Sequence, residues 1–160
     1  MRKLAPVVAF ALAASVLSLA IVGSSGAIEQ ETTLTFVWEK VNETGYDIDG
    51  DHNLTPGDGW VSNSVLKNDG EVVGKVIENC QYVKVRPDGM GGTLQCVGTA
   101  KLDGGHIAYQ LRLGLEEGTT PHMTAAVTGG TGDFANARGD MQAEVDETTG
   151  RIWVTLRLLP

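Results

Sequence analysis

The sequence predicts an all-β fold: an eight-stranded antiparallel up-and-down β-barrel preceded by a signal peptide. Apolar and polar residues alternate with a period of two through most of the chain, and glycine-rich turns separate the alternating runs. No convincing helical periodicity follows the N-terminal segment. Eight strands joined by successive hairpins form a meander. A meander of this size commonly closes into a barrel, because closure removes the exposed strand edges.

The strands are expected at residues 32–43, 59–67, 71–86, 93–102, 106–116, 121–128, 138–147 and 151–159. Turns are expected at Asn68-Asp69-Gly70, Asp103-Gly104-Gly105 and Thr148-Thr149-Gly150, each of which has a residue able to take a positive φ. Within 106–116 the odd positions are apolar, so one face of this strand enters a core. Alternation does not say whether that core is the barrel lumen or an outer face packed against a partner.

Residues 1–27 have the order of a secretory signal peptide. Basic Met1-Arg2-Lys3 precedes an apolar run over 4–22, and small residues end at Ser25-Gly26-Ala27. The alternative is a transmembrane anchor, since the apolar run is nearly long enough to span a bilayer. Cleavage after Ala27 would leave residues 28–160 as one domain, with no room for a second. The short basic region and the alanine-rich apolar run indicate a bacterial protein secreted to the extracellular space.

The charge of the chain argues against two classes of partner. Its formal net charge is −8, and loss of Arg2 and Lys3 with the signal peptide would make the mature domain more negative still. An acidic surface repels nucleic acid and anionic membranes, so neither is expected as a partner after signal cleavage.

Cys80 and Cys96 are expected to form a disulfide. A hairpin centred on Asp88, within the turn-rich segment 87–92, would place the two cysteines directly opposite each other on neighbouring strands. An oxidising destination favours joining them, and closing this loop would contribute about 3 kcal/mol in the chain-entropy model. Two separate buried thiols are the alternative.

The segment 128–139, Thr-Gly-Gly-Thr-Gly-Asp-Phe-Ala-Asn-Ala-Arg-Gly, resembles the signature GGTGxFxxARG of plant dirigent proteins and the related allene oxide cyclases. The resemblance also includes Gly57-Asp58 and the strand segment 74–80, and strand order and turns agree from about Leu34 onward. It implies an eight-stranded barrel, often trimeric, with a largely apolar cavity. Proteins of these families hold a reactive small molecule in one conformation, so that proximity and orientation select the product. Phe134 of the signature is expected to plug one end of the barrel.

Four residues are candidates for binding a ligand. Arg138 matches the arginine of the signature, although an ion pair with Asp133 or Asp140 would explain it structurally. Asn63 lies in 61–64, which replaces the proline and asparagine pattern of the cyclases' second strand. Period-two alternation puts Lys40 and Asn42 on one face of the first strand, where they would line the cavity mouth or lie exposed at the strand end.

No metal or other cofactor is expected. Residues 47–58 place oxygen ligands at the positions of a calcium loop, but His52 stands where glycine is usual and Asp58 replaces the bidentate glutamate, so a solvated acidic loop is the favoured interpretation. The three histidines are dispersed, and no Ser-His-Asp or phosphate-loop pattern is visible. The sequence therefore predicts a secreted barrel that binds a small apolar molecule and steers its cyclisation or coupling, as an isomerase or dirigent-type protein. A non-catalytic binding barrel and a structural barrel remain open alternatives.

Overall fold

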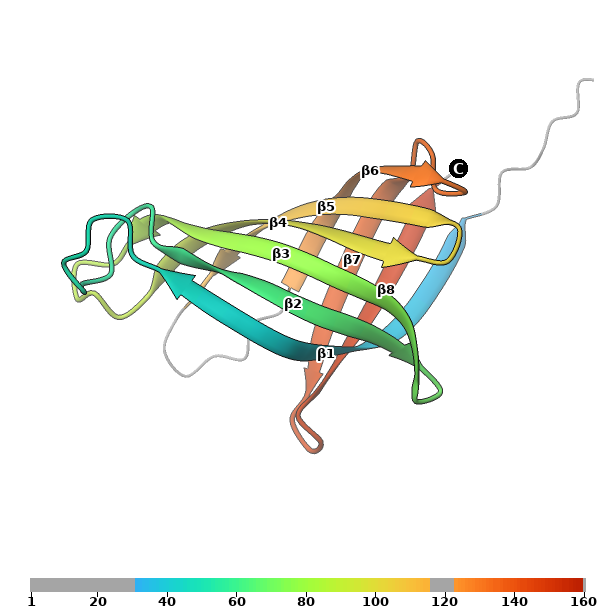
Figure 1. Cartoon of the computed structure of the whole chain (residues 1–160), viewed down its shortest axis with the longest axis horizontal. Coiled ribbons are helices and arrows are strands. Elements are labelled where there is room, and N and C mark those ends of the chain that lie inside the picture. Colours follow the sequence, from blue (N-terminus) through green and yellow to red (C-terminus); the bar gives the residue numbers. More distant parts are fainter. Residues whose placement is uncertain (1–30, 116–122, 160) are drawn as a thin grey trace, which may run out of the picture.

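Eight antiparallel strands close into a barrel in the computed structural model, which describes residues 31–115 and 123–159 (Figure 1). Each strand pairs with its chain neighbours, and β1 closes the barrel against β8. The strands are β1 Thr32–Tyr46, β2 Gly59–Asn68, β3 Glu71–Val85, β4 Gly92–Leu102, β5 Gly105–Gly114, β6 Met123–Gly132, β7 Arg138–Asp146 and β8 Arg151–Leu159. The all-β, up-and-down barrel predicted from the sequence is confirmed.

Strand bounds differ from the expected ones most at β6, which runs on to Gly132 because the glycine-rich segment pairs with the start of β5. Glycine suits this close approach: a Cβ at Gly130 would lie 2.2 Å from the carbonyl oxygen of Phe134. Residues 121 and 122, and the predicted signal peptide 1–27, lie outside the described residues. No helix in the described part of the chain is long and apolar enough to cross a membrane.

The turn between β2 and β3 shows why the hairpins form where they do. Asp69 and Gly70 have φ values of 49° and 85°, so both central residues are left-handed, as a two-residue turn that matches the strand twist requires. Glycine takes this conformation without steric cost, and aspartate tolerates it better than most residues.

Apolar side chains fill one half of the barrel lumen, so the apolar stripes of the sequence face inward. Leu66, Ile107, Val154 and Leu156 are at most 2% exposed. Phe134, from the connection between β6 and β7, packs partly buried against this core. This packed half lies toward the turns that join β2 to β3 and β4 to β5. The other half, called the hollow half because it contains a cavity, is lined by Trp60, Glu78 and Met123 among others.

A β-bulge in β1 reverses which side chains face the lumen. Lys40 is opposite Ser64 and Asn42 is opposite Asn63, so Val41 is an extra residue without a partner. Even positions face inward before the bulge, whereas Glu43 faces inward after it, opposite Ser62. The expectation that Lys40 and Asn42 share a face is therefore wrong, because uninterrupted alternation does not hold through a bulge.

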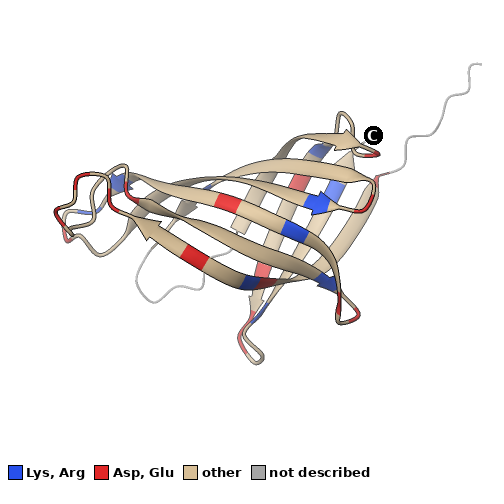
Figure 2. Ribbon diagram, in the orientation of Figure 1, with Lys and Arg blue, Asp and Glu red and all other residues tan. Residues whose placement is uncertain are grey.

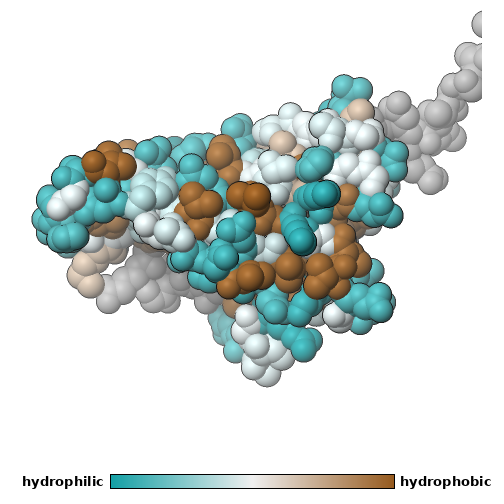
Figure 3. Space-filling model, viewed as in Figure 1, coloured by the Kyte–Doolittle hydropathy of each residue, from teal (hydrophilic) through white to brown (hydrophobic). Residues whose placement is uncertain are grey.

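Acidic residues gather at the tips of several hairpins, and other charged residues are spread along the strands (Figure 2). The long hairpins of β1–β4 carry the acidic loop 47–58 at their far tip, at the left of Figure 1. Apolar side chains are scattered among polar ones on the outer face of these strands (Figure 3). They include Val61, Ile77 and Val97, whose exposures are 37%, 60% and 51%.

Candidate functional site

The hollow half of the lumen contains a cavity of about 180 Å³. This volume is below the roughly 300–1,000 Å³ that is usual for drug-sized ligands, so it fits a small molecule. Its lining comes from every strand except β4 and is Trp38, Lys40, Glu43, Trp60, Ser62, Ser64, Glu78, Leu111, Met123, Met141, Ala143 and Ile152.

The two sides of this cavity differ in polarity. All the charged and hydroxyl groups that line it belong to β1–β3, whereas the lining residues of β5–β8 are apolar. Trp38 and Trp60 add aromatic surface to the polar side. A ligand that matches both walls is apolar over most of its surface and polar at one edge.

Glu78 is a half-buried carboxylate in the polar wall. Its position follows from a row of paired residues that runs across four neighbouring strands. Ser62, Glu78, Gly98 and Tyr109 are successive register partners on β2–β5. The Tyr109 ring lies across Gly98, where a Cβ would be 2.2 Å from the ring carbon Cζ. The missing side chain lets the Tyr109 hydroxyl donate a hydrogen bond of 2.9 Å to Glu78 Oε2.

Burial changes the acid–base properties of both members of this pair. It raises the pKa of Glu78, and the hydrogen bond from Tyr109 partly offsets that rise. The pKa of Tyr109 is raised too, by burial first and then by the adjacent Glu78 carboxylate, so the phenol stays a proton donor. Trp38 packs edge-on against the Tyr109 ring, with the ring centroids 6.3 Å apart.

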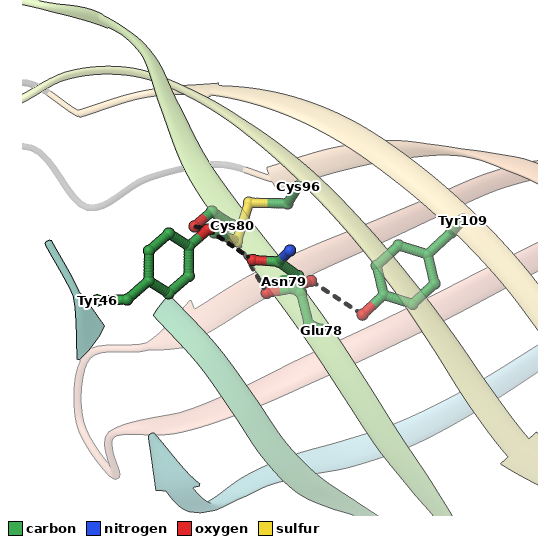
Figure 4. The surroundings of a disulfide bond; sticks show 6 residues. All are labelled: Tyr46, Glu78, Asn79, Cys80, Cys96 and Tyr109. Atoms are coloured by element: carbon green, nitrogen blue, oxygen red, sulfur yellow. Dashed lines mark hydrogen bonds between the residues drawn. A yellow bond between two sulfur atoms is a disulfide. The ribbon is translucent and has the colours of Figure 1, made fainter. Parts of the chain in front are cut away.

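The predicted disulfide is present and lies beside this pair (Figure 4). Cys80 and Cys96 are directly opposite on β3 and β4 and almost fully buried. The Cys80 sulfur is 3.4 Å from Glu78 Oε1. A disulfide sulfur has no hydrogen to donate, so this is a packing contact. On the outer side of β3, the Tyr46 hydroxyl donates to Asn79 Oδ1 at 2.9 Å.

Of the four predicted ligand-binding residues, Lys40 lines the cavity and the other three lie elsewhere. Lys40 is at the mouth, where its Nζ is 3.2 Å from Glu43 Oε2. Asn42 and Asn63 form a side-chain hydrogen bond of 2.8 Å on the outer face. Arg138 is exposed at the start of β7. Asp140, one of its two suggested partners, is 3.9 Å from Arg157 Nε.

Sequence reasoning missed Glu43, Glu78 and Tyr109 as site residues. A signal for Glu78 was present: it shares an inward-facing stripe with Val76 and Cys80, and a carboxylate in such a stripe is unusual. Glu43 could not be found this way, because the bulge at Val41 leaves no clear trace in the alternation.

The acidic loop 47–58 forms a rim beside the cavity mouth. Carboxylate oxygens of Asp47, Asp49 and Asp58 lie within 4.8 Å of one another. Asp58 is buried and already accepts hydrogen bonds at both oxygens, from the Ile48 backbone at one and from Thr55 at the other. These bonds assign it a structural role in shaping the loop.

A wider surface groove of about 490 Å³ adjoins the loop, and Trp60 lines both this groove and the lumen cavity. The groove also contains Asp47 and Asp58, and its described lining residues include no lysine or arginine. The approach to the lumen on this side is therefore acidic.

The chain is a closed eight-stranded antiparallel barrel with a small cavity in its lumen. Its fold is that of the dirigent proteins and of cyclase-like barrels, as the signature in 128–139 implied. No protein-family model and no curated protein sequence matches the chain.

Three solved structures illustrate the similarity. A pyocyanin demethylase is 28% identical, with a TM-score of 0.64 over 79% of this chain and 99% of its own. A pterocarpan synthase dirigent protein is 23% identical, with a TM-score of 0.56 over 81% of this chain and 88% of its own. A Diels–Alderase from Streptomyces koyangensis is 12% identical, with a TM-score of 0.58 over 84% of this chain and 72% of its own.

Proposed function

We propose that this protein is an exported barrel that binds a small, largely apolar molecule in its lumen and steers that molecule's cyclisation or coupling. The observation that carries the proposal is the lumen cavity, with its apolar wall from β5–β8 and its polar wall from β1–β3. A cavity of this kind fixes the orientation of a bound molecule, and orientation alone selects among products when a reactive substrate has several ways to react.

Two of the neighbouring structures support this activity class: one is named a dirigent protein and the other a Diels–Alderase. The neighbour at 28% identity is named for pyocyanin, which makes pyocyanin the first candidate ligand to test.

Calorimetric titration of the mature domain with pyocyanin tests lumenal binding, together with tryptophan fluorescence, since Trp38 and Trp60 line the cavity. Native mass spectrometry of protein recovered from its own culture medium extends the test to ligands that are retained from the producing cells. We expect one small molecule per barrel. Ala143→Met projects a longer side chain into the cavity and should abolish binding.

Glu144→Met, one residue along β7 and exposed, is the matched control and should bind as the wild type does. Thermal melting establishes that both variants fold. Equal binding by the wild type and Ala143→Met would contradict a lumenal site, and a wild-type protein without any ligand would contradict the proposed function.

Export is part of the proposal and is supported by the disulfide, which suits an oxidising compartment. We expect the secreted protein to begin near Ile28. Intact-mass measurement of protein from the medium checks this, and retention of residues 1–27 in a membrane fraction would favour the anchor instead.

A further inference from the structure

The lumen cavity contains a carboxylate, Glu78, that has no cationic partner among the described residues. Lys40, Glu43 and Glu78 are the charged residues of its lining. Lys40 and Glu43 lie 3.2 Å apart and offset each other at the mouth. Glu78 is deeper, and the partner that the described residues give it is the neutral hydroxyl of Tyr109.

We infer that the lumen selects a ligand with an apolar, aromatic body and one positively charged nitrogen, which pairs with the Glu78 carboxylate. This rests on the proposed binding of a small molecule in the lumen. The apolar wall from β5–β8 holds the body of the ligand, and the polar wall receives its charged edge. Trp38 and Trp60 are part of that wall, and aromatic rings attract organic cations that approach their faces.

The geometry of Glu78 leaves one oxygen for such a ligand. Tyr109 donates to Oε2, whereas Oε1 contacts a disulfide sulfur that has no hydrogen. Among residues 31–115 and 123–159, no group donates a hydrogen bond to Oε1. Tyr109 is thus a positioning residue: it holds the carboxylate by one oxygen, and Gly98 provides the space for its ring.

Burial without a cationic partner also explains why the pKa of Glu78 is raised. A cation at Oε1 would favour the ionised form and relieve this cost. The groups that face Glu78 are Tyr109 from β5, the Cys80–Cys96 disulfide of β3 and β4, and the mouth pair Lys40 and Glu43 of β1. The acidic groove that Trp60 shares with the lumen would draw cations toward the entrance.

Two naphthalene probes of nearly equal shape test the inference: 2-(aminomethyl)naphthalene, which is cationic near neutral pH, and 2-(hydroxymethyl)naphthalene, which is neutral. We expect the wild type to bind the amine about tenfold or more tightly than the alcohol at about pH 7, as for a hydrogen bond to a charged group. Glu78→Gln should bring this preference to about threefold or less while leaving affinity for the alcohol nearly unchanged. Glu144→Gln makes the same charge change on the outer face and should keep the preference.

The pH profile separates pairing with Glu78 from the general acidity of the protein. The amine stays protonated below neutral pH, so the wild-type preference should fall as pH falls through the pKa of Glu78. In Glu78→Gln it should be flat. Tyr109→Phe removes the hydrogen bond that lowers the pKa of Glu78, so the fall should move to higher pH. If the role of Tyr109 is purely structural, Tyr109→Phe should weaken the binding of both probes without shifting the pH dependence of the preference for the amine.

Each contrary result is distinct. Equal binding of the amine and the alcohol, or a preference that survives in Glu78→Gln, would overturn the cation inference and leave lumenal binding intact. Binding of neither probe by the wild type would overturn the inference and would also count against the proposed function.

Discussion

Gly98 decides where the Tyr109 ring lies, and through that ring it positions the Glu78 carboxylate. Gly98→Ala would put a methyl group about 2.2 Å from Cζ and 2.3 Å from the hydroxyl oxygen of Tyr109. Because the ring is buried, it cannot move freely, and overpacking of this kind costs about 1–3 kcal/mol. We expect a lower free energy of unfolding in urea and loss of the Tyr109–Glu78 hydrogen bond.

Gly114→Ala is the matched control, because a Cβ there meets nothing within 4 Å and the residue lies at the exposed end of β5, the strand next to the β4 strand of Gly98. The free energy of unfolding of Gly114→Ala should be close to that of the wild type. If Gly98→Ala is as stable as Gly114→Ala, the ring is not held as described.

Glu78 should make stability depend on pH in the direction opposite to most carboxylates. Its pKa is raised in the folded state, so folding favours the protonated acid. This stabilisation is complete below the pKa that Glu78 has in the unfolded chain, and it is lost as pH rises through the pKa of Glu78 in the folded protein. Each unit of difference between the two pKa values corresponds to about 1.4 kcal/mol of stability. Glu78→Gln keeps a neutral group there, so it should melt at a higher temperature than the wild type at about pH 8 and at a similar temperature near pH 4.

Melting curves of both proteins across this range check the prediction, with Glu144→Gln as the exposed control. A variant that is less stable than the wild type at high pH would show that the ionised Glu78 is stabilised by its surroundings.

At the scale of elements, the hairpin of β3 and β4 is fastened by the disulfide that closes it. Cys80 and Cys96 are 16 residues apart, so the bond restricts a short loop of the unfolded chain. Cys80→Ala/Cys96→Ala should lower the free energy of unfolding by about 3 kcal/mol. Chemical denaturation measures this, and intact mass before and after reduction shows the bond directly. Full labelling of both thiols in folded, unreduced protein would contradict it.

Asp58 holds the acidic loop between β1 and β2 through hydrogen bonds to backbone amides of that loop. Asp58→Ala removes the acceptor for the backbone amides of Ile48 and Thr55, and we expect a loss of about 1–3 kcal/mol in the free energy of unfolding. Asp51→Ala, an exposed carboxylate of the same loop, should cost less. Since both Asp58 oxygens are occupied, added calcium should scarcely change the melting temperature, and a large calcium-dependent rise would restore the calcium-loop interpretation.

Closure of the barrel removes its exposed strand edges. The family resemblance implies a homotrimer, and we propose that the exposed apolar residues Val61, Ile77 and Val97 of β2–β4 lie in its interface. Ile77→Lys should then dissociate the oligomer, because it would bury a charge at the contact.

Light scattering coupled to size exclusion measures the oligomer mass. Val72→Lys introduces the same charge at another exposed position of β3, next to the turn, and should leave the assembly intact. A monomeric wild type, or equal effects of both variants, would contradict the proposed face.

The barrel, its strand order and the disulfide could be predicted from the sequence, because alternation, turn residues and the symmetric spacing of Cys80 and Cys96 about a turn are local signals. For Lys40 the sequence left both the cavity mouth and an exposed strand end open, and the structure places this residue in the cavity lining. The rest of the candidate site depends on contacts between strands. The bulge at Val41 turned Glu43 inward and Asn42 outward, and a one-residue insertion in a ladder is set by pairing between strands rather than by local pattern. The Glu78–Tyr109 pair joins residues 31 positions apart across Gly98, so it exists only once β3, β4 and β5 lie in register.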